Sequence, residues 1–351
     1  MSLLPSPQEL EPVAAAVRGV LDRLDRVLLG RPALHRLVMA GVLARGHILL
    51  EGLPGVGKTA LVRALGDLLG LSFKRVQFTP DLMPGDILGS HILQQAADGA
   101  RREMVFEPGP IFTNILLADE INRASPKMQS ALLEAMQERQ VSLLGVTRKL
   151  PDPFFVLASQ NPIELEGTYP LPEAQLDRFL FKLNVTDVSA AVLEEIIATR
   201  RRGEAPATGE APIDAGQLQQ WFGMMERVVL PRPVARYIAK LVEATHPDRA
   251  ACPKGVREYV QFGASPRAAI AMAEAARAVA LIAGRPTVGF EDVRTVASPV
   301  LNHRLILNYK ARLDGLDAPA AVARLLEMVD DTGLNLPADV SLTPAGAEAQ
   351  P

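Results

Sequence analysis

The segment Gly-Leu-Pro-Gly-Val-Gly-Lys-Thr at residues 52–59 limits what this chain can fold into more than any other part of it. It fits the pattern G-x-x-x-x-G-K-[ST], in which the glycines let backbone N–H groups turn inward onto phosphate oxygens. The apolar run His47–Glu51 predicts a buried strand before it, and Ala60–Leu65 predicts the start of a helix after it. Since strand, glycine loop and helix follow in the order that the motif needs, the sequence predicts a phosphate-binding loop.

The positions of this loop have separate expected roles. Lys58 is placed to reach the β- and γ-phosphates of a nucleotide, and the Thr59 hydroxyl is placed to hold Mg²⁺. The helix that follows adds the positive end of its dipole. The other loop residues expected to bind the nucleotide are Gly52, Pro54, Gly55, Val56, Gly57 and Ala60. The alternative is a glycine-rich turn that binds nothing.

Short apolar runs alternate with helical stretches from residue 47 to about residue 185, after a helical region at residues 8–45. Such alternation favours a parallel sheet that is covered by helices on both faces. Ligands of these sheets bind beyond the carboxyl ends of the strands, which is where Gly52, Glu120 and Gln160 fall. The five runs that predict strands are His47–Glu51, Phe73–Phe78, Ile115–Asp119, Phe154–Ser159 and Phe179–Val185.

Two adjacent acids, Asp119 and Glu120, stand at the end of the third of these runs. Neighbouring side chains of a strand point to opposite faces, so one carboxylate can enter the Mg²⁺ shell while the other faces the γ-phosphate. We assign Asp119 to the metal and Glu120 to the water that attacks the phosphorus, because hydrolysis needs a group that orients or deprotonates that water. The alternative is a strand that simply ends in polar residues at the surface.

Asn161 follows the fourth run and is placed to bind the γ-phosphate or the attacking water. An Asn before a proline, here Pro162, is also common in turns, and both interpretations stay open.

Arg178 and Arg267 are candidates to neutralise charge on a transferring phosphoryl group, because a guanidinium suits that task. Ser265 is a good N-cap and Pro266 suits the first helical position, which would fix the direction of Arg267 in the first turn of a helix. For either arginine, a structural ion pair is the alternative role.

Three neighbouring segments have mainly structural interpretations. Residues 125–140 predict a core helix that Ser125 caps. Residues 141–150 resemble a hairpin, in which Arg148 and Lys149 either meet a partner or form a solvated tip. Residues 84–110 predict an inserted element of about 30 residues, with a longer ordinary crossover as the alternative.

The pattern changes after residue 188. Residues 201–212 are polar and rich in Pro and Gly, which predicts a loop, and the pattern from Ala215 to about Met328 is helical throughout. We therefore predict a core with N-terminal helices at residues 1–188, a linker at 189–214 and a smaller all-helical domain at 215–330. Residues 331–351 are rich in Pro, Ala, Asp and Glu and predict a loosely ordered tail.

Composition limits the compartment and the class of ligand that the sequence predicts. The one cysteine, Cys252, excludes an internal disulfide framework and suits a reducing cytoplasm. The N-terminus lacks the pattern of a signal peptide, and there is no apolar run long enough to predict a membrane span. The net charge of −3 gives no support to a general nucleic-acid binder, although a local basic channel stays open.

Taken together, the chain resembles the MoxR family of AAA+ ATPases over roughly residues 10–328. The order and number of the matching segments make the resemblance specific. They are the loop at 52–59, Pro-Gly-Asp-Ile-Leu-Gly at 84–89, Phe-Glu-Pro-Gly-Pro-Ile-Phe at 106–112, Ala-Asp-Glu-Ile-Asn-Arg-Ala at 118–124, Gln-Ser-Ala-Leu-Leu-Glu-Ala-Met-Gln-Glu at 129–138, Ala-Ser-Gln-Asn-Pro at 158–162, Leu-Pro-Glu-Ala-Gln-Leu-Asp-Arg-Phe at 171–179 and Gly-Ala-Ser-Pro-Arg-Ala at 263–268.

The resemblance implies a P-loop NTPase fold, an αβα sandwich with a five-stranded parallel sheet, followed by a helical lid. It implies ATP and Mg²⁺ as cofactors and a ring of identical subunits, usually a hexamer, with ATP at each boundary. By motif position, Asn161 looks like sensor 1, Arg178 like the arginine finger that reaches a neighbour's nucleotide, and Arg267 like the lid's sensor 2. The segment Leu28, Leu29 and Gly30 is similar to the one that packs on the adenine.

Relatives in this family act as chaperone-like or metal-insertion motors, often beside proteins with von Willebrand factor A domains. The resemblance therefore implies a client protein and such an adaptor as partners. Rival interpretations are a small-molecule kinase, a nucleotide-gated scaffold with little turnover, a magnesium-chelatase-like motor subunit, and a motor that tracks DNA. A kinase gives no reason for Glu120 beside Asp119, and the acidic balance counts against DNA.

Overall fold

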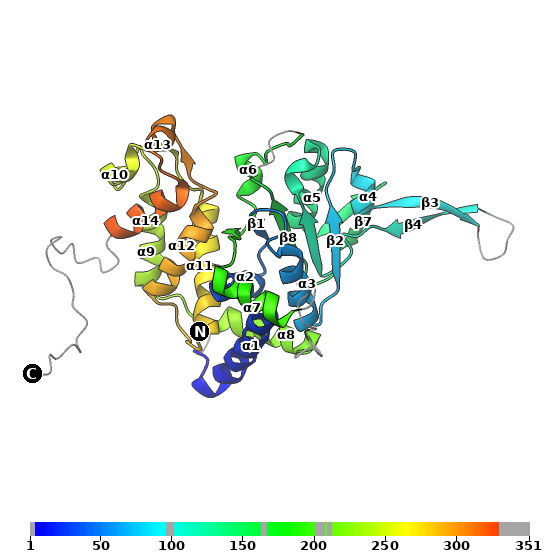
Figure 1. Ribbon diagram of the computed structural model, residues 1–351, viewed down its shortest axis with the longest axis horizontal. Coiled ribbons are helices and arrows are strands. Elements are labelled where there is room, and N and C mark those ends of the chain that lie inside the picture. Colours follow the sequence, from blue (N-terminus) through cyan, green and yellow to red (C-terminus); the bar gives the residue numbers. More distant parts are fainter. Residues whose placement is uncertain (1–3, 96–101, 163–166, 201–207, 209–212, 330–351) are drawn as a thin grey trace, which may run out of the picture.

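The computed structural model describes residues 4–95, 102–162, 167–200, 208 and 213–329, and it contains the predicted five-stranded parallel sheet (Figure 1). The strand order is β2-β5-β8-β1-β9, and every neighbouring pair is parallel. Each strand lies within two residues of its predicted bounds, so the predicted α/β fold class is confirmed. The strands are β1 (Ile48–Glu51), β2 (Phe73–Gln77), β5 (Ile115–Asp119), β8 (Phe155–Gln160) and β9 (Phe181–Asn184).

The central strands are buried on both faces, and alternate residues belong to two different hydrophobic cores. Ile48 and Leu50 of β1 pack in one core, while Leu49 between them packs in the other. A strand that is apolar at every position therefore needs a helical layer on each side. One layer comprises α1 (Pro7–Val27), α2 (Pro32–Leu43) and α3 (Lys58–Leu68), and the other contains α4 (Pro84–Leu88) and α5 (Pro126–Glu138).

The ends of these helices follow from local sequence. Ser6 and Glu9 form a capping box at the start of α1, with Pro7 at its first turn. Ser125 caps α5 by accepting the Met128 N–H, as predicted. A short 3-10 turn, η1 (Ile121–Arg123), follows the acids of β5, and α6 (Glu173–Leu176) leads into β9.

The inserted element at residues 84–110 consists of α4 and a hairpin of β3 (Gly89–Gln95) and β4 (Arg102–Pro108). Figure 1 shows this hairpin projecting away from the sheet. Glycine is required where it joins the body, since Gly89 has φ of +99° and a Cβ on Gly109 would lie 2.1 Å from the Ile87 oxygen. The crossover from β2 to β5 therefore carries an inserted hairpin, as predicted, and is not merely a longer ordinary connection.

The predicted hairpin at residues 141–150 is also present, as β6 (Gln140–Leu143) and β7 (Val146–Lys149). Its tip is Leu144, which is 81% exposed. Arg148 does not extend into solvent as the solvated-tip interpretation required, because its guanidinium lies 3.8 Å from the ring centre of Phe106 in β4. The two hairpins are therefore joined by a cation–π contact.

The second domain is helical, with one correction to the prediction of an all-helical lid. A two-stranded antiparallel sheet, β10 (Val260–Phe262) with β11 (Ile306–Leu307), lies within it. Its core is continuous with one face of the first domain, because α11 packs against α2. Its helices are α8 (Ala215–Arg227), α9 (Arg232–Glu243), α10 (Lys254–Arg257), α11 (Pro266–Ile282), α12 (Phe290–Leu301), α13 (Tyr309–Leu313) and α14 (Ala318–Met328).

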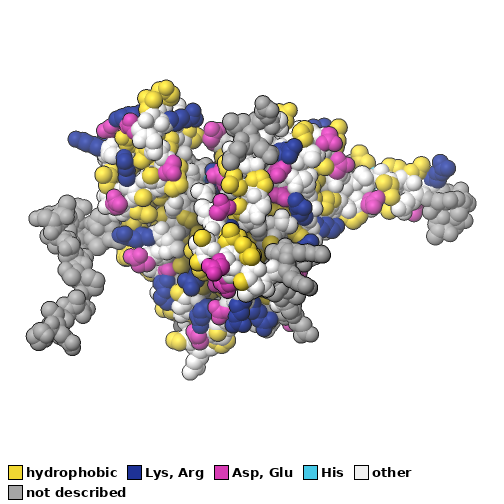
Figure 2. All heavy atoms as spheres, in the orientation of Figure 1, with side chains coloured by type: hydrophobic (Ala, Val, Ile, Leu, Met, Phe, Trp, Pro, Cys, Tyr) yellow, Lys and Arg dark blue, Asp and Glu magenta, His cyan; other side chains and the backbone are white. Residues whose placement is uncertain are grey.

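The segment predicted as a linker at residues 189–214 contains a helix, α7 (Ala190–Thr199), whose start is capped by Ser189. The loop predicted at residues 201–212 falls outside the described residues except for residue 208, and so does the tail predicted at residues 331–351. Among the described helices, none combines the length and apolar character that crossing a membrane requires. On the face in Figure 2, Lys and Arg side chains are interspersed with Asp and Glu.

Candidate nucleotide site

The phosphate loop connects the end of β1 with the start of α3. Gly55 and Gly57 have φ angles of +81° and +88°, a backbone region that favours glycine, and Gly57 directly precedes the helix. A Cβ on Gly52 would lie 2.5 Å from the Val185 oxygen, so the loop leaves β1 pressed against the chain that leaves β9. These three glycines are therefore needed by geometry as well as by the motif.

Lys58 is buried, with 8% of its surface exposed, and its ammonium donates to the Gly52 oxygen at 2.6 Å. Burial lowers the pKa of Lys58, while the carboxylates of Asp119, Glu120 and Glu51 favour its charged form. The cation is thus held over the loop, close to the acids at the end of β5.

Asp119 is the more enclosed of the two acids and is 8% exposed. Its Oδ2 accepts from Arg75, at 2.7 Å from Nη2 and 3.0 Å from Nε, and its Oδ1 accepts from the Ser159 hydroxyl. The same hydroxyl oxygen accepts the Glu120 N–H at 2.9 Å. One serine of β8 therefore fixes both acids.

Glu120 occupies the left-handed region, with φ of +57°, which is uncommon for a residue other than glycine. Its carboxylate accepts from Gln77 Nε2 at 2.8 Å and from Arg123 Nη1 at 3.1 Å. Backbone strain of this kind persists only where the surroundings determine it, and it concentrates at functional sites. The turn brings Glu120 to Gln77 and Arg123 while Asp119 pairs with Arg75 and Ser159, so the two carboxylates have separate partners.

A cavity of about 360 Å³ unites these groups. Asn161, which is 4% exposed, lines it beside the two acids. The three separated segments that the sequence placed at the carboxyl edge of the sheet therefore do converge there. The cavity is lined by Pro54, Gly55, Gly57, Lys58, Thr59, Ala60, Arg75, Gln77, Asp119, Glu120 and Asn161.

A second cavity, of about 430 Å³, adjoins the loop at Gly55, Gly57 and Ala60 and is largely apolar. Leu28 and Leu29 line it, as expected of a segment that packs on a base. Gly30 does not line it but has φ of +89°, and a Cβ there would lie 2.8 Å from Val192 of α7.

Leu193 and Ile196 of α7 also line this cavity. The segment predicted as a linker thus contributes to the lining of this cavity. Arg31 closes another side, where its Nη1 donates to the Val56 oxygen of the phosphate loop at 2.5 Å.

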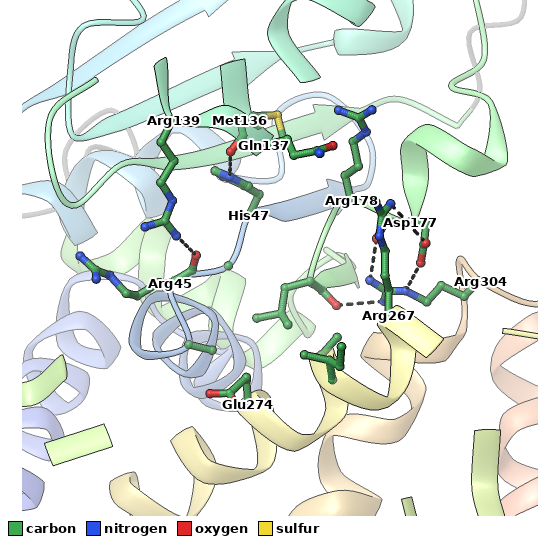
Figure 3. Close-up of a pocket in the computed structure, with 15 residues that line it drawn as sticks. Arg45, His47, Met136, Gln137, Arg139, Asp177, Arg178, Arg267, Glu274 and Arg304 are labelled. Atoms are coloured by element: carbon green, nitrogen blue, oxygen red, sulfur yellow. Dashed lines mark hydrogen bonds and ion pairs between the residues drawn. The ribbon is translucent and has the colours of Figure 1, made fainter. Parts of the chain in front are cut away.

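Arg178 and Arg267 lie elsewhere, in a pocket of about 390 Å³ (Figure 3). Gly46 and His47 precede β1, and Leu180 precedes β9, so this pocket is at the amino edge of the sheet. We call it the arginine pocket, and Figure 3 shows Arg178 and Arg267 on one side of it with Arg45 and Arg139 on the other. Its lining is Ala44, Arg45, Gly46, His47, Met136, Gln137, Arg139, Asp177, Arg178, Leu180, Arg267, Ile270, Ala271, Glu274 and Arg304.

The strand between the two edges has four residues, a length of roughly 13 Å. Neither Arg178 nor Arg267 lines the cavities around Lys58, so the structure does not bring the arginines to the phosphate loop of their own subunit. Arg178 donates from Nη1 to the Leu133 oxygen at 2.8 Å, and its Nε is buried without a hydrogen-bond partner among the described residues.

Ser265 is the N-cap residue of α11 as predicted, but its side chain makes no cap hydrogen bond. Its hydroxyl instead donates to Asp177 Oδ2 at 3.0 Å, which joins the start of α11 to the segment that precedes β9. Pro266 does begin the helix, so Arg267 is fixed in its first turn as predicted.

Sequence reasoning missed several polar residues of these sites. Arg75 and Gln77 alternate on β2 and so reach the two acids of β5 on the same side, which is a signal that a period of two offers. Ser159 belongs to the segment Ala-Ser-Gln-Asn-Pro at 158–162, but the sequence alone indicated no role for it. Arg304 gave no signal, because its partners belong to the other domain.

The residues at the carboxyl edge fit a Mg²⁺–nucleotide. Glycines with open backbone, a buried lysine and a threonine at a helix start form a phosphate cradle, and the carboxylate of Asp119 already holds a cation in the form of Arg75. An apolar cavity continues from the cradle for a base. The arrangement is that of a nucleotide site.

Comparison with known proteins agrees with a nucleotide site. The sequence family described as "ATPase family associated with various cellular activities (AAA)" matches residues 47–181, and an AAA lid domain matches residues 254–325. The chain is 43% identical to "Chaperone MoxR1" of Mycobacterium tuberculosis, over 92% of this chain and 85% of that protein. The chain belongs to the MoxR family of AAA+ ATPases.

Further relatives extend this likeness. "Protein MoxR" of Paracoccus denitrificans is 34% identical over 88% of this chain and 94% of its own length. The crystal structure of a candidate ATPase from Cytophaga hutchinsonii matches with a TM-score of 0.84 and 36% identity, over 92% of this chain and 97% of that one. The MoxR resemblance and the AAA+ fold with a lid are thereby confirmed, while the individual site residues stay predictions.

Proposed function

We propose that this MoxR-type protein hydrolyses ATP with Mg²⁺ in a ring of identical subunits, six being the expected number. The observation that carries the proposal is the separation of Arg178 and Arg267 from the phosphate loop by the length of the sheet. Charge-neutralising arginines that cannot reach their own subunit's phosphates have a use only if another copy presents its nucleotide to them.

At the carboxyl edge, each residue has one task. The loop amides and Lys58 bind the phosphates, and Thr59 and Asp119 hold the Mg²⁺. Bound Mg²⁺ supplies charge neutralisation for the phosphates. Glu120 orients and deprotonates the attacking water, and Asn161 positions that water or the terminal phosphate.

At the amino edge, Arg178 supplies positive charge to the nucleotide of the next subunit, and Arg267 supports it from the lid. Both guanidiniums border one pocket, and Arg267 is 56% exposed at its side chain, which leaves it accessible to a neighbour. Leu28, Leu29 and α7 hold the base within one subunit, so each subunit can bind its nucleotide before the ring forms around it.

The output of the cycle is chaperone-like remodelling, maturation or metal insertion in a client protein, with a von Willebrand factor A domain protein as adaptor. The name of the mycobacterial relative, a chaperone, supports the first of these. We place this work in the cytoplasm, where ATP is available and thiols such as Cys252 stay reduced.

A mixing experiment tests the assembly. Arg178→Ala should retain nucleotide binding and lose turnover by about 10³- to 10⁵-fold. When it is mixed in equal amounts with Lys58→Ala subunits, roughly one boundary in four joins an intact phosphate loop to an intact arginine, so turnover should return to that share of the wild-type value.

Two results would count against the ring. One is the absence of any recovery when differently tagged subunits are shown to share the same rings. The other is a turnover per subunit in the wild-type protein that does not change on dilution to concentrations where light scattering finds only monomers.

A further inference from the structure

Arg304 follows the lid helix α12 and is among the most buried charged residues described, with 3% of its side chain exposed. All five of its N–H groups are used. Nε donates to Asp177 Oδ1 at 2.8 Å. Nη1 donates to the oxygens of Val300 at 2.5 Å and Leu180 at 3.2 Å, and Nη2 donates to those of Asp177 at 3.0 Å and Phe179 at 2.6 Å.

The acceptors of these bonds bracket Arg178. The Asp177 oxygen comes immediately before it, and the Phe179 oxygen comes immediately after it. The residue before Arg304 adds to this grip, since His303 Nε2 lies 3.1 Å from the same Phe179 oxygen. The lid therefore holds the backbone on both sides of Arg178.

The same cluster reaches the second arginine of the pocket. Asp177 Oδ2 accepts from Ser265 Oγ at 3.0 Å and lies 3.7 Å from Arg267 Nη1. Asp177 thus stands between Arg304 on one side and the first turn of α11 on the other. One carboxylate relates the directions of Arg178, which follows it in sequence, and Arg267, which faces it across the domain boundary.

A buried guanidinium is costly to desolvate, and burial lowers the pKa of Arg304 while the Asp177 carboxylate opposes that change. A hydrophobic contact would join two domains with less cost. A planar fork of five donors does what a hydrophobic contact cannot, because it fixes the peptide planes around Arg178 in orientation as well as in distance.

We propose that Arg304 and Asp177 are positioning residues, which set Arg178 and Arg267 in the geometry that the neighbouring subunit's nucleotide requires. The proposal rests on the trans role of Arg178 stated above. In this proposal the lid also affects hydrolysis in the neighbouring subunit, because a rotation of α12 moves the backbone that carries Arg178. A lid of one subunit thereby governs hydrolysis in another.

The test uses Arg304→Lys, which keeps the charge but has three donors on one atom in place of the fork. Nucleotide affinity of the variant should equal that of the wild type, because its own phosphate loop is intact. Turnover should fall by about 10²-fold, the effect of a misplaced catalytic group. Asp177→Asn, which removes the charge at nearly constant size, should act in the same direction and serves if Arg304→Lys does not fold.

Mixing separates positioning from loss of structure. Arg304→Lys mixed with Lys58→Ala should recover roughly one quarter of wild-type turnover, because the Lys58→Ala neighbour supplies well-placed arginines. Arg312→Lys, a change at an exposed arginine of α13 in the same domain, should leave turnover within about twofold of the wild type and needs no mixing.

Two results would overturn the proposal. Wild-type turnover in unmixed Arg304→Lys and Asp177→Asn would show that neither residue sets the arginines. Low turnover that mixing does not restore, in an assay where Arg178→Ala is restored, would show a structural role only. If Arg178→Ala itself is not restored, the trans reaction fails, and that result is distinct from both.

Discussion

At the carboxyl edge of the sheet two cations, Lys58 and Arg75, and two acids line a single cavity, whereas at the amino edge arginines outnumber acids by five to two. The first set has its charges balanced within the chain and is enclosed, since Lys58 and Asp119 are each 8% exposed. The second set contains Arg267, whose side chain is 56% exposed. A balanced, buried set can hold a small ligand alone, while a cationic surplus near the surface needs an anion from outside.

The two edges also differ in the contacts that fix the positions of their site residues. At the carboxyl edge, side chains fix side chains, as Ser159 does for Asp119 and Arg75 does on its other oxygen. At the amino edge, the lid fixes backbone, through Arg304 and the peptide oxygens around Arg178. The first arrangement is complete without the lid, and the second depends on it.

Lys58→Ala tests the carboxyl edge most severely. The change removes the ammonium above the loop, so both nucleotide affinity and turnover should be lost, with turnover down by more than about 10³-fold. Binding of a fluorescent ATP analogue, with and without Mg²⁺, measures the first loss, and phosphate release measures the second. Retained affinity would contradict the phosphate-loop assignment.

Arg267→Ala is the matching change at the amino edge, and its effect should be smaller. The side chain is exposed and lies 3.7 Å from its acid, so in the proposed ring it would contribute charge to a neighbour without being held rigidly. We expect unchanged nucleotide affinity and turnover lower by about 10- to 10²-fold. Arg277→Ala, on the same helix and paired with Glu274, is the control. A loss of affinity in Arg267→Ala as large as in Lys58→Ala would break the division between the edges.

His47 allows the mildest test, because it lines the arginine pocket without a catalytic task. Its Nδ1 accepts the Val156 N–H and its Nε2 faces the Met136 oxygen, so the ring is neutral with the proton on Nε2. Burial lowers its pKa from 6.5 to about 4. The unfolded chain therefore takes up a proton first as the pH falls, and stability is lost between about pH 6.5 and pH 4.

This titration is worth about 3 kcal/mol at most. Denaturant unfolding at a series of pH values measures it, and His47→Gln, which cannot titrate, should lose about 3 kcal/mol less stability than the wild type across this pH range. Turnover of the folded wild type near pH 6 should not follow the same curve. If it did, the imidazole rather than the arginines would govern the amino edge.

The fold and the carboxyl edge were predictable because their signals are local. Buried strands of a parallel sheet are apolar at successive positions, and Gly55, Gly57 and Lys58 belong to a short motif whose geometry the backbone dictates. The acids at the end of β5 followed from the alternation of side chains along a strand.

The rest depended on contacts between residues far apart in the sequence. The place of Arg267 is set by α11 packing on α2, and no period in the sequence of either helix reports that contact. The β10–β11 pair has strands of three and two residues, too short for a pattern. The linker prediction missed α7 because its neighbours are rich in Pro and Gly, although Ala190–Thr199 is itself a good helical sequence.

The hydroxyl of Ser159 donates to the carboxylate of Asp119 and accepts the N–H of Glu120. In the roles proposed above, one oxygen atom therefore couples cation binding by Asp119 to the orientation of the attacking water by Glu120. Any displacement of β8 is inherited by both at once. We therefore expect a change in this strand to alter cation binding and water orientation together, and not one without the other.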